Sequence, residues 1–531
     1  MATDTATFDY IVVGAGSAGA VAASRLSEDP SASVLLIEAG GTHRHMNVRI
    51  PAAFSSQFKT KIDWDLHTEP EPNLDGRRIY HPRGKMLGGS SSMNAMIYVR
   101  GNRADYDGWA KAGATGWSYD ELLPLFKRSE VNSRGAGKYH GGDGPLHVED
   151  LRSPNPLSRM FVDAMVATGA ARNDDFNGAE QEGAGLYQVT HHRGHRWTTA
   201  DGYLIPASKR RNLTVLKHAH ALRLRMSRQC VSGIDVEVNG QRQEYRCRRE
   251  VVVSAGAFNT PQLLMLSGIG PADHLAAHDI DVVVDNPNVG AHLMDHPMYC
   301  VNFATTAKGT LAGAQSPAQL LNFVLRRRGL LTSNVGEGGA FVHTRQGDEA
   351  PAMQYLFAPG YFWKHGFTNY NEPSFAIGCS LVGPKSRGTV RLRSSDPKER
   401  VAATFNYFDA PEDMDSMVDG IERARVVATT GELGKVVGKE LHPGSALQTR
   451  TELERAIRHD VEHTYHPACT ARIGTERDGV VDHELRVHGV SGLRVADASV
   501  FPTIPHGNTH APSVLAGEKV ADLIRGTTGR V

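Results

Sequence analysis

A glycine-rich turn, residues 14–19 with the sequence GAGSAG, follows directly on the apolar residues 8–13. A second apolar run, residues 34–37, ends at Glu38. This order predicts a strand, a tight turn, a helix from about Ser17 and a second strand ending in an acid, which is the layout of a dinucleotide-binding βαβ unit. The unit commits the start of the chain to an α/β fold.

Each part of this unit has a physical role. Glycines let the backbone turn tightly and approach a pyrophosphate, whose charge is stabilised at the N-terminus of the following helix. Glu38 lies 19 positions after Gly19 (38 − 19), where a carboxylate accepts hydrogen bonds from both ribose hydroxyls. It would repel a 2′-phosphate, which argues against NADP. The unit alone leaves NAD and FAD open.

Length and charge set further bounds. A chain of 531 residues exceeds what one core usually holds, so we expect two domains or one large domain with insertions. The 58 basic and 58 acidic residues give a formal net charge of zero, and like charges gather only in short runs such as 209–211 and 326–328. This balance argues against nucleic acid or an anionic membrane as a partner.

The compartment is indicated by what the sequence lacks. Residues 1–7 contain no basic segment, and nowhere do eighteen apolar residues follow one another. The five cysteines form no C-x-x-C pair, which suits a reducing compartment and offers no metal framework. We therefore expect a soluble, cytoplasmic protein without a membrane span.

Segments with the character of a nucleotide site recur in the middle and at the end of the chain. Residues 250–257 predict a short buried strand and 260–268 a helix, and residues 493–498 and 512–525 repeat that order. The stretch 40–82 predicts an irregular connection. The expected nucleotide-binding domain is discontinuous, with segments 1–155, 212–305 and 462–531, and a second, substrate-covering domain takes 156–211 and 306–461.

Three motifs carry a family resemblance. Residues 84–94 read GKMLGGSSSMN, residues 256–270 read GAFNTPQLLMLSGIG, and Tyr465-His466-Pro467 follows near the end. Together with the first βαβ unit, and over nearly the whole chain, they resemble the glucose-methanol-choline (GMC) family of FAD-dependent alcohol oxidoreductases. The resemblance implies a Rossmann-like FAD-binding domain and a discontinuous α+β substrate-binding domain with an antiparallel sheet and helices.

The resemblance resolves the cofactor in favour of FAD. Some relatives attach FAD covalently through a histidine, but Met93 stands at that position here, so we expect noncovalent FAD. Asp497 resembles a family residue near the flavin diphosphate and ribityl chain, where backbone amides or ribityl hydroxyls would be its partners. The implied cofactor-binding residues are Gly14, Gly16, Ser17, Ala18, Gly19, Glu38, Ala39, Trp64, Arg83, Gly88, Gly89, Ser91, Asn94, Ala95, Met96, Ala221, Ala255, Gly256, Asp497, Ala498, Asn508, Thr509 and His510.

Two histidines are the catalytic candidates. Flavin-dependent alcohol oxidation needs a base for the hydroxyl proton and a donor that holds the developing alkoxide. The resemblance makes His466 the base and places the second residue 44 positions later (510 − 466), at His510. A shift of two positions would put Asn508 there instead; otherwise Asn508 is expected on the flavin side.

The expected activity is oxidation of a primary alcohol, whether aliphatic, aromatic or polyol, to an aldehyde or ketone. The electron acceptor is oxygen or a quinone or dye, and both an oxidase and a dehydrogenase stay open, as does a homodimer. The alternative from another class is a non-redox flavoprotein of this fold, such as a hydroxynitrile lyase or a decarboxylase.

Two further features stay open. His191, His192 and His195 lie close together, but no carboxylate or thiolate completes a metal-ligand set at the expected spacing, so we expect no metal and interpret the run as a strand or channel wall. Glu337 lies in a glycine-rich stretch that the resemblance puts on the substrate side. Pointing inward, it would recognise cationic or polyhydroxylated substrates; pointing outward, it would be a solvated charge.

Overall fold

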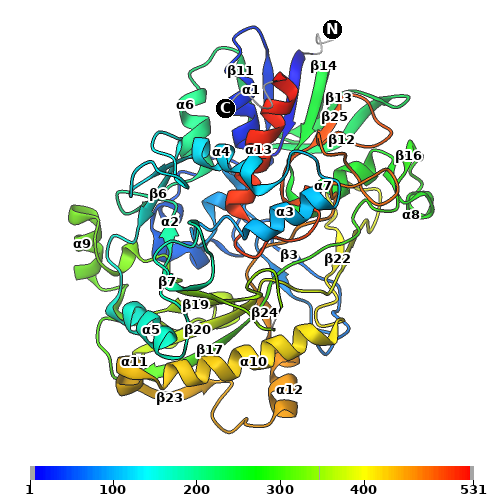
Figure 1. Ribbon diagram of the computed structural model, residues 1–531. Helices are drawn as coiled ribbons and strands as arrows, with labels where there is room; N and C mark the ends of the chain where they lie inside the picture. Colours follow the sequence, from blue (N-terminus) through cyan, green and yellow to red (C-terminus); the bar gives the residue numbers. More distant parts are fainter. Residues whose placement is uncertain (1–5, 346, 527–531) are drawn as a thin grey trace.

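The computed structural model describes residues 6–345 and 347–526 and contains two seven-stranded sheets, one in each half of the molecule (Figure 1). The first sheet has the order β11-β2-β1-β14-β13-β12, and β25 pairs with β14. Its strands are β1 (Thr7–Val13), β2 (Val34–Ile37), β11 (Leu213–Leu216), β12 (Ala219–Ser227), β13 (Cys230–Val238), β14 (Gln241–Val253) and β25 (Leu493–Val495).

The centre of this sheet is parallel and buried on both faces. β1 pairs in parallel with β2 and β14, and β2 with β11, and their residues 10–13 and 34–37 are buried. Such continuous apolar runs are typical of strands covered by helices on both sides. α1 (Gly19–Leu26) and α13 (His510–Arg525) pack against each other beside this sheet, so close that a Cβ at Gly517 would lie 2.4 Å from the Ala18 carbonyl oxygen.

The middle of the chain departs from its predicted bounds. The predicted short strand 250–257 is the end of the thirteen-residue β14, which forms an antiparallel meander with β12 and β13. α7 (Gly256–Leu266) begins four residues earlier than expected and has Pro261 in its second turn rather than its first. The helix starts early because Asp497 accepts the amide of Gly256 (2.8 Å) and the Thr260 hydroxyl (2.6 Å).

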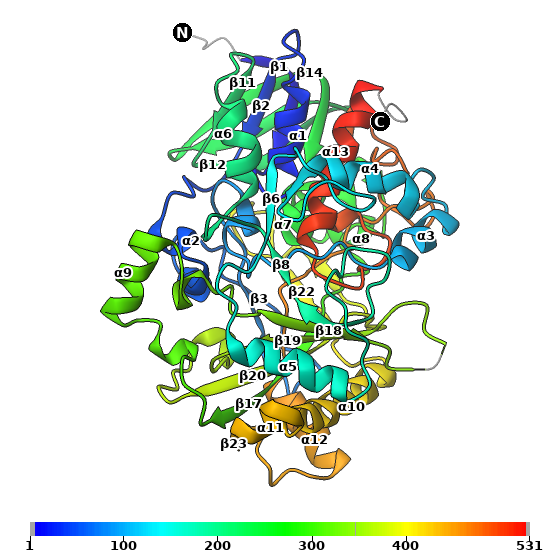
Figure 2. The ribbon, with the colours of Figure 1, turned by 60° about the vertical axis from the view of Figure 1, so that its left-hand side comes forward.

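The second sheet is antiparallel, with the order β23-β17-β20-β19-β18-β7 and β24 paired to β17. Its strands are β7 (Gly183–Leu186), β17 (Pro297–Thr305), β18 (Gly338–Val342), β19 (Met353–Ala358), β20 (Ser374–Leu381), β23 (Val437–His442) and β24 (Glu462–His463). α5 (Pro156–Ala167) and α10 (Pro411–Ala428) pack on it, as Figure 2 shows. A core of buried aromatic and aliphatic side chains fills the space between them.

Two segments expected in the FAD-binding domain pair with strands of the second sheet. Residues 297–305 and 462–463 were placed in the FAD-binding domain, but they form β17 and β24 of the second sheet. The apolar residues of β17 gave no sign of which sheet they join, because pairing with β20 and β23 is set by segments far along the chain.

The remaining elements are short or peripheral. The connection 40–82 is mostly irregular, as predicted, with four short elements. The other helices are α2 (Met46–Arg49), η1 (Pro51–Gln57), η2 (Gly89–Ser92), α3 (Arg103–Lys111), α4 (Tyr119–Ser129), η3 (Ala200–Leu204), α6 (Ile205–Ala207), α8 (Ala272–Ala276), η4 (Leu311–Gly313), α9 (Pro317–Arg326), η5 (Leu330–Thr332), η6 (Lys364–Gly366), α11 (Gly431–Val436), α12 (Arg450–Asp460) and η7 (Ala498–Val500). The other strands are β3 (Leu66–His67), β4 (Tyr80–His81), β5 (Glu130–Asn132), β6 (Leu146–Asp150), β8 (Gln188–Val189), β9 (His191–His192), β10 (His195–Arg196), β15 (Ile269–Gly270), β16 (Val284–Asp285), β21 (Thr389–Arg391) and β22 (Ala402–Thr404).

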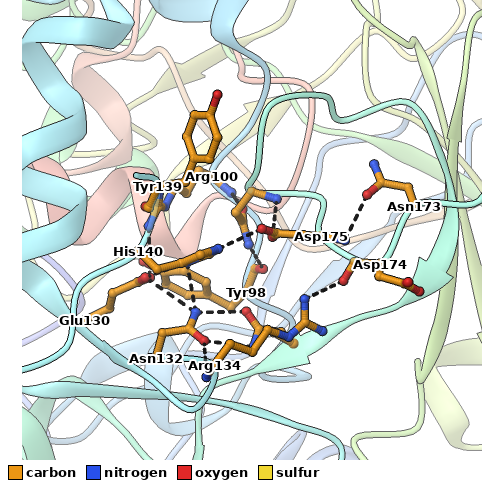
Figure 3. A network of polar contacts seen from close by, with 12 residues as sticks. Tyr98, Arg100, Glu130, Asn132, Arg134, Tyr139, His140, Asn173, Asp174 and Asp175 are labelled. Atoms are coloured by element: carbon orange, nitrogen blue, oxygen red, sulfur yellow. Dashed lines mark hydrogen bonds and ion pairs between the residues drawn. The ribbon is translucent and has the colours of Figure 1, made fainter. Parts of the chain in front are cut away.

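A buried polar network ties the segment after α4 to the loop before β7 (Figure 3). His140 contacts Glu130 through Nδ1 and Asp175 through Nε2, both at 2.8 Å, and Arg100 pairs with Glu130 at 3.1 Å. Burial disfavours the charged imidazole, but the bonds to Asp175 and Glu130 outweigh it and raise the pKa of His140 to about 9. The network therefore holds a protonated histidine at neutral pH.

Within the part of the chain that the structure describes, no helix combines the length and apolar character needed to cross a bilayer.

Candidate active site

The candidate site is a cavity lined by segments from the start, middle and end of the chain. Its empty volume, including its open mouth, is about 1770 Å³. Its wall contains the glycine turn, the N-termini of α7 and α13, the segment 93–97 and the loop around His466. The three regions of nucleotide-site character found in the sequence thus meet at one place.

The glycine turn has the close packing that a pyrophosphate site requires. Gly14 has φ +97°, and a Cβ there would lie 2.4 Å from the Ser254 carbonyl oxygen. A Cβ at Gly19 would lie 1.9 Å from the Gly14 carbonyl oxygen, whereas one at Gly16 would meet nothing within 4 Å. The first and third glycines therefore permit the turn and the helix packing, and the second leaves the backbone open to a ligand.

The second glycine stretch packs directly on the first. A Cβ at Gly89 would lie 2.7 Å from the Cα of Gly16. The two turns therefore form one continuous backbone surface, a cradle into which a side chain at Gly16 would project. This cradle, the α1 N-terminus and an acid at the end of β2 together fit the diphosphate and ribose of an adenine dinucleotide such as FAD.

Glu38 lines the cavity from the end of β2. Its carboxylate accepts backbone amides from Ala15 (2.9 Å) and Gly40 (2.8 Å). Burial raises its pKa to about 7, although both bonds favour the charged form. Each oxygen keeps a further lone pair, so these contacts are compatible with the expected ribose hydroxyls.

Most residues expected at the cofactor lie on the cavity wall. They are Gly14, Gly16, Ser17, Ala18, Glu38, Ala39, Trp64, Arg83, Gly89, Asn94, Ala95, Met96, Ala221, Ala255, Gly256, Asp497, Ala498, Asn508, Thr509 and His510. Gly19, Gly88 and Ser91 are not part of this wall. Gly19 packs behind the turn against Gly14, and the Ser91 hydroxyl donates to the Gly88 carbonyl oxygen (2.6 Å).

His466 lies on the same wall and is held from its backbone and both ring nitrogens. Its backbone amide donates to Asp295 (2.7 Å), and Nδ1 lies 2.9 Å from both Thr464 Oγ1 and His296 Nδ1. Nε2 lies 3.3 Å from Nδ2 of Asn508. An amide nitrogen only donates, so Nε2 accepts and the ring proton sits on Nδ1.

The same surroundings keep His466 uncharged. Burial, with smaller contributions from Arg83 and His463, lowers its pKa to about 3. A neutral imidazole with its Nε2 lone pair on the cavity side has the protonation state of a general base.

The orientation of the Asn508 amide is set by a residue of the second sheet that belongs to no sequence motif. Nε2 of the fully buried Gln354 on β19 donates to Asn508 Oδ1 (3.1 Å) and to the Tyr187 hydroxyl (3.0 Å). Because Oδ1 faces Gln354, Nδ2 faces His466. The hydrogen-bond chain from β19 therefore reaches the imidazole.

His510 occupies a different position on the wall. It is the first residue of α13, and its Nδ1 lies 2.9 Å from the Ser17 hydroxyl. Burial and the charge of Arg196 lower its pKa to about 4. Its Nε2 is buried and has no hydrogen-bond partner among the described residues. Asn508, and not His510, is thus the direct neighbour of the His466 ring.

Asp295 and His296 are two further site residues that the sequence analysis missed. Asp295 Oδ1 accepts the backbone amides of both His296 and His466, 2.8 and 2.7 Å away. The signal that would have found them is the dipeptide His-Pro, which occurs at 81–82, 296–297 and 466–467 as well as 442–443. The first three of these histidines gather around Asp295.

His81, Asp295 and His463 bring three potential metal-ligand atoms within 4.8 Å. The rings of His81 and His463 are stacked 3.7 Å apart and only 13° from parallel, so their lone pairs lie in separate parallel planes. His463 also uses both nitrogens, accepting the Tyr465 amide (3.0 Å) and donating to the Tyr80 carbonyl (2.9 Å). We therefore assign this cluster to packing and charge around His466.

Neither of the two features left open by the sequence is part of the cavity wall. Glu337 is buried and accepts the Asn155 amide (2.7 Å) and the Ser158 hydroxyl (2.8 Å), so it secures the start of α5. In the histidine run, His191 contacts the sulfur of Met96 (3.2 Å), whereas His192 lies beside His147 and Glu149. A carboxylate does approach His192, which the sequence spacing did not suggest.

Comparisons with known proteins agree with this geometry. Family models described as GMC oxidoreductase match residues 8–298 and 384–517. An uncharacterised GMC-type oxidoreductase from Mycobacterium tuberculosis is 45% identical over 525 residues, covering 97% of this chain and 99% of the relative. An oxygen-dependent choline dehydrogenase from Sinorhizobium fredii is 41% identical over 532 residues, covering 98% and 95%.

Solved structures give the same picture. Pyridoxine 4-oxidase from Mesorbium loti superimposes with a TM-score of 0.90 at 29% identity, covering 98% of this chain and 99% of its own. A formate oxidase variant from Aspergillus oryzae has a TM-score of 0.93 at 29% identity and covers 99% of each chain. With the dinucleotide cradle and the histidine site in one cavity, the chain belongs to the GMC oxidoreductase family and is an FAD-type oxidoreductase.

Proposed function

We propose that the protein oxidises a primary alcohol to an aldehyde, with noncovalently bound FAD as the cofactor and His466 as the base. The observation that carries the proposal is the state of His466: a neutral, buried imidazole whose Nε2 accepts a hydrogen bond on the wall of the cavity that holds the dinucleotide cradle. FAD, when bound, supplies the hydride acceptor for the carbinol carbon.

The FAD would be held by the glycine turn, Glu38 and the start of α7. Met93, at the position of the linking histidine in some relatives, is a buried thioether on the cavity wall and offers no nucleophile of that kind. This supports noncovalent binding. Asp497 has the backbone-amide partners expected of it, since it accepts the Gly256 and Ser499 amides (2.8 and 2.7 Å).

His466 would take the hydroxyl proton on Nε2, with the alcohol hydroxyl displacing the 3.3 Å contact that the Asn508 amide makes with the Nε2 lone pair. Its low pKa in the resting protein makes it a weak base, but a neighbouring alkoxide favours the charged ring as the proton moves. Nδ1–H is meanwhile anchored on Thr464 or His296. The positioned lone pair is thus the contribution of the protein to proton removal.

We assign different roles to Asn508 and His510. Asn508 orients and polarises His466 through its amide. His510 donates from Nε2 to a ligand oxygen: with Ser17 donating to Nδ1, the ring proton lies on Nε2, and a buried N–H without a partner costs about 1–3 kcal/mol until a ligand accepts it. Replacing His510 would then weaken alkoxide stabilisation while leaving the His466 tautomer intact.

The cavity favours an uncharged alcohol. Phe54, Phe58, Met93, Ile97 and Tyr465 line one region with apolar and aromatic surface. The carboxylates on the wall are Glu38 and Asp497, both engaged with backbone amides, and Glu337 belongs to α5 instead. A cationic substrate would therefore lack a free carboxylate among the described wall residues, and the comparisons give the non-redox alternative no support.

The test is an anaerobic screen of the purified, flavin-loaded protein against aliphatic, aromatic and polyol alcohols, with choline included as a cationic alcohol. We expect bleaching of the flavin by an uncharged primary alcohol. Failure of every alcohol to reduce the flavin would refute the redox assignment, and reduction by choline alone would refute the uncharged substrate. Reoxidation of the reduced enzyme in air then separates an oxidase from a dehydrogenase.

A further inference from the structure

The helix α9 (Pro317–Arg326) exposes an apolar face that nothing in the described chain covers. Leu320, Leu321, Val324 and Leu325 have exposed fractions of 52, 59, 53 and 71%. At 100° per residue these side chains fall within an arc of about 140°. α9 stands at the edge of the molecule in Figures 1 and 2, so this arc points away from the body of the protein.

The opposite side of α9 anchors it. Phe323 is buried, and its ring meets that of His195 edge-on at 5.3 Å. The Leu330 amide, just after the helix, donates to Gln319 (3.0 Å). The exposed face is therefore presented by a helix that is fixed to the fold.

Charge around this helix differs sharply from the neutral average of the chain. Residues 306–328 contain Lys308, Arg326, Arg327 and Arg328 and no Asp or Glu. The segment 39–62, which forms α2 and η1, likewise contains four basic residues and no acid. His195 links the two segments, since its Nδ1 lies 3.4 Å from the Arg49 carbonyl oxygen while its ring contacts Phe323.

We propose that this basic and apolar face, formed by α9 and α2, docks on the surface of an anionic lipid bilayer. An exposed leucine-rich arc bordered by arginines is the combination that inserts shallowly at the headgroup boundary while its cations meet lipid phosphates. A second copy of the chain across a two-fold axis would instead bring the two arginine clusters together. The zero net charge of the chain conceals this local excess.

The position of the face gives docking a consequence for the site. α9 contacts η5, η5 contacts η1, and η1 contributes Phe54 to the wall of the cavity. A docked molecule would hold the aromatic part of its cavity wall close to the membrane. The docking itself does not depend on which alcohol is oxidised.

The test is co-sedimentation of the FAD-loaded protein with phosphatidylcholine vesicles, with and without phosphatidylglycerol. We expect at least about tenfold more bound protein with the anionic lipid, and a decrease with salt. The double variants Leu321→Ser with Leu325→Ser, and Arg326→Gln with Arg328→Gln, should each lose at least about tenfold in binding. Val426→Ser is the matched control, since Val426 is 55% exposed but lies on α10.

Melting temperature and flavin content establish that each variant is folded. Binding of the leucine double variant equal to that of wild type would overturn the proposal, as would equal binding to both kinds of vesicle or none to either. Sedimentation equilibrium without lipid tests whether a second copy of the chain covers this face instead. A dimer that the leucine substitutions dissociate would assign the face to a second copy and overturn the proposal.

Discussion

Gln354→Glu is the substitution that most specifically perturbs the proposed base without touching it. Gln354 donates to Asn508 Oδ1 at 3.1 Å, and Asn508 donates to His466 Nε2 at 3.3 Å. A carboxylate at position 354 would face Oδ1 with an oxygen of its own. The amide of Asn508 then reverses, and its oxygen requires a proton on Nε2 of His466.

The size of the effect follows from what His466 loses. A ring with its proton on Nε2 no longer offers the lone pair that takes the hydroxyl proton, and general-base catalysis contributes about 10²–10⁴ in rate, or about 3–5 kcal/mol. Gln354→Leu removes the hydrogen bonds to Tyr187 and Asn508, of which only the bond to Asn508, worth about 1 kcal/mol, acts on the amide, and it does not force the reversal. We therefore expect the leucine variant to be about fivefold slower, and the glutamate variant at least about a hundredfold slower at a pH above the pKa of its new carboxyl group, where that group is ionised.

The pH dependence separates positioning from damage to the fold. Position 354 is fully buried, so the new carboxyl group has a raised pKa, and its protonated form donates to Asn508 as the amide does. Anaerobic flavin reduction by the glutamate variant should recover as the pH falls, while the leucine variant shows no recovery. Reduction at the wild-type rate even at the alkaline end of the pH series, or an equal and pH-independent loss in both variants, would refute the reasoning.

Three further predictions concern other parts of the structure. His510→Ala should slow flavin reduction by about tenfold to a hundredfold, because one charge-assisted hydrogen bond is lost. Asn508→Ala should in addition raise the pH at which His466 protonates. Identical pH profiles of flavin reduction in the two variants would contradict the separate roles. Glu337→Gln should lower the free energy of unfolding by about 1–3 kcal/mol in denaturant titrations, because Glu337 holds the start of α5. The affinity for substrate should not change. Weaker substrate binding at unchanged stability would contradict this prediction. The pKa of His140 is raised to about 9, so its stabilisation of the fold should be fully present below pH 6.5 and lost as the pH rises through 9. The expected decrease in the free energy of unfolding is about 2 kcal/mol after allowing for solvent screening. The same slope of stability against pH in His140→Gln as in wild type would exclude this prediction.

The parts of the fold that the sequence predicted are those with local signals. β1 and β2 lie within one residue of the apolar runs that predicted them, and the predicted final helix differs by two residues at its start. Most of β14 was missed because residues 241–250 are rich in charge, and residues 241–246 form an antiparallel ladder with β13. The pairing of β17 could not be predicted because its partners are 70 residues or more away in sequence.

The candidate site was likewise predictable only where a local sequence motif reports its geometry. The cradle around Gly14 and Gly16 was readable because glycine patterns report backbone geometry directly. The environment of His466 was not, since Gln354, Asp295 and His296 come from separate parts of the chain and belong to no motif used in the prediction. The spacing also did not reveal that Asn508 rather than His510 contacts the His466 ring.

The central claim is that His466 removes the substrate proton, and single-turnover flavin reduction in wild type and His466→Ala tests it most directly. With one alcohol at saturating concentration and no oxygen, the account predicts that the variant retains FAD but is reduced about 10²–10⁴-fold more slowly. Reduction of the variant at the wild-type rate, with FAD fully bound, would contradict the account.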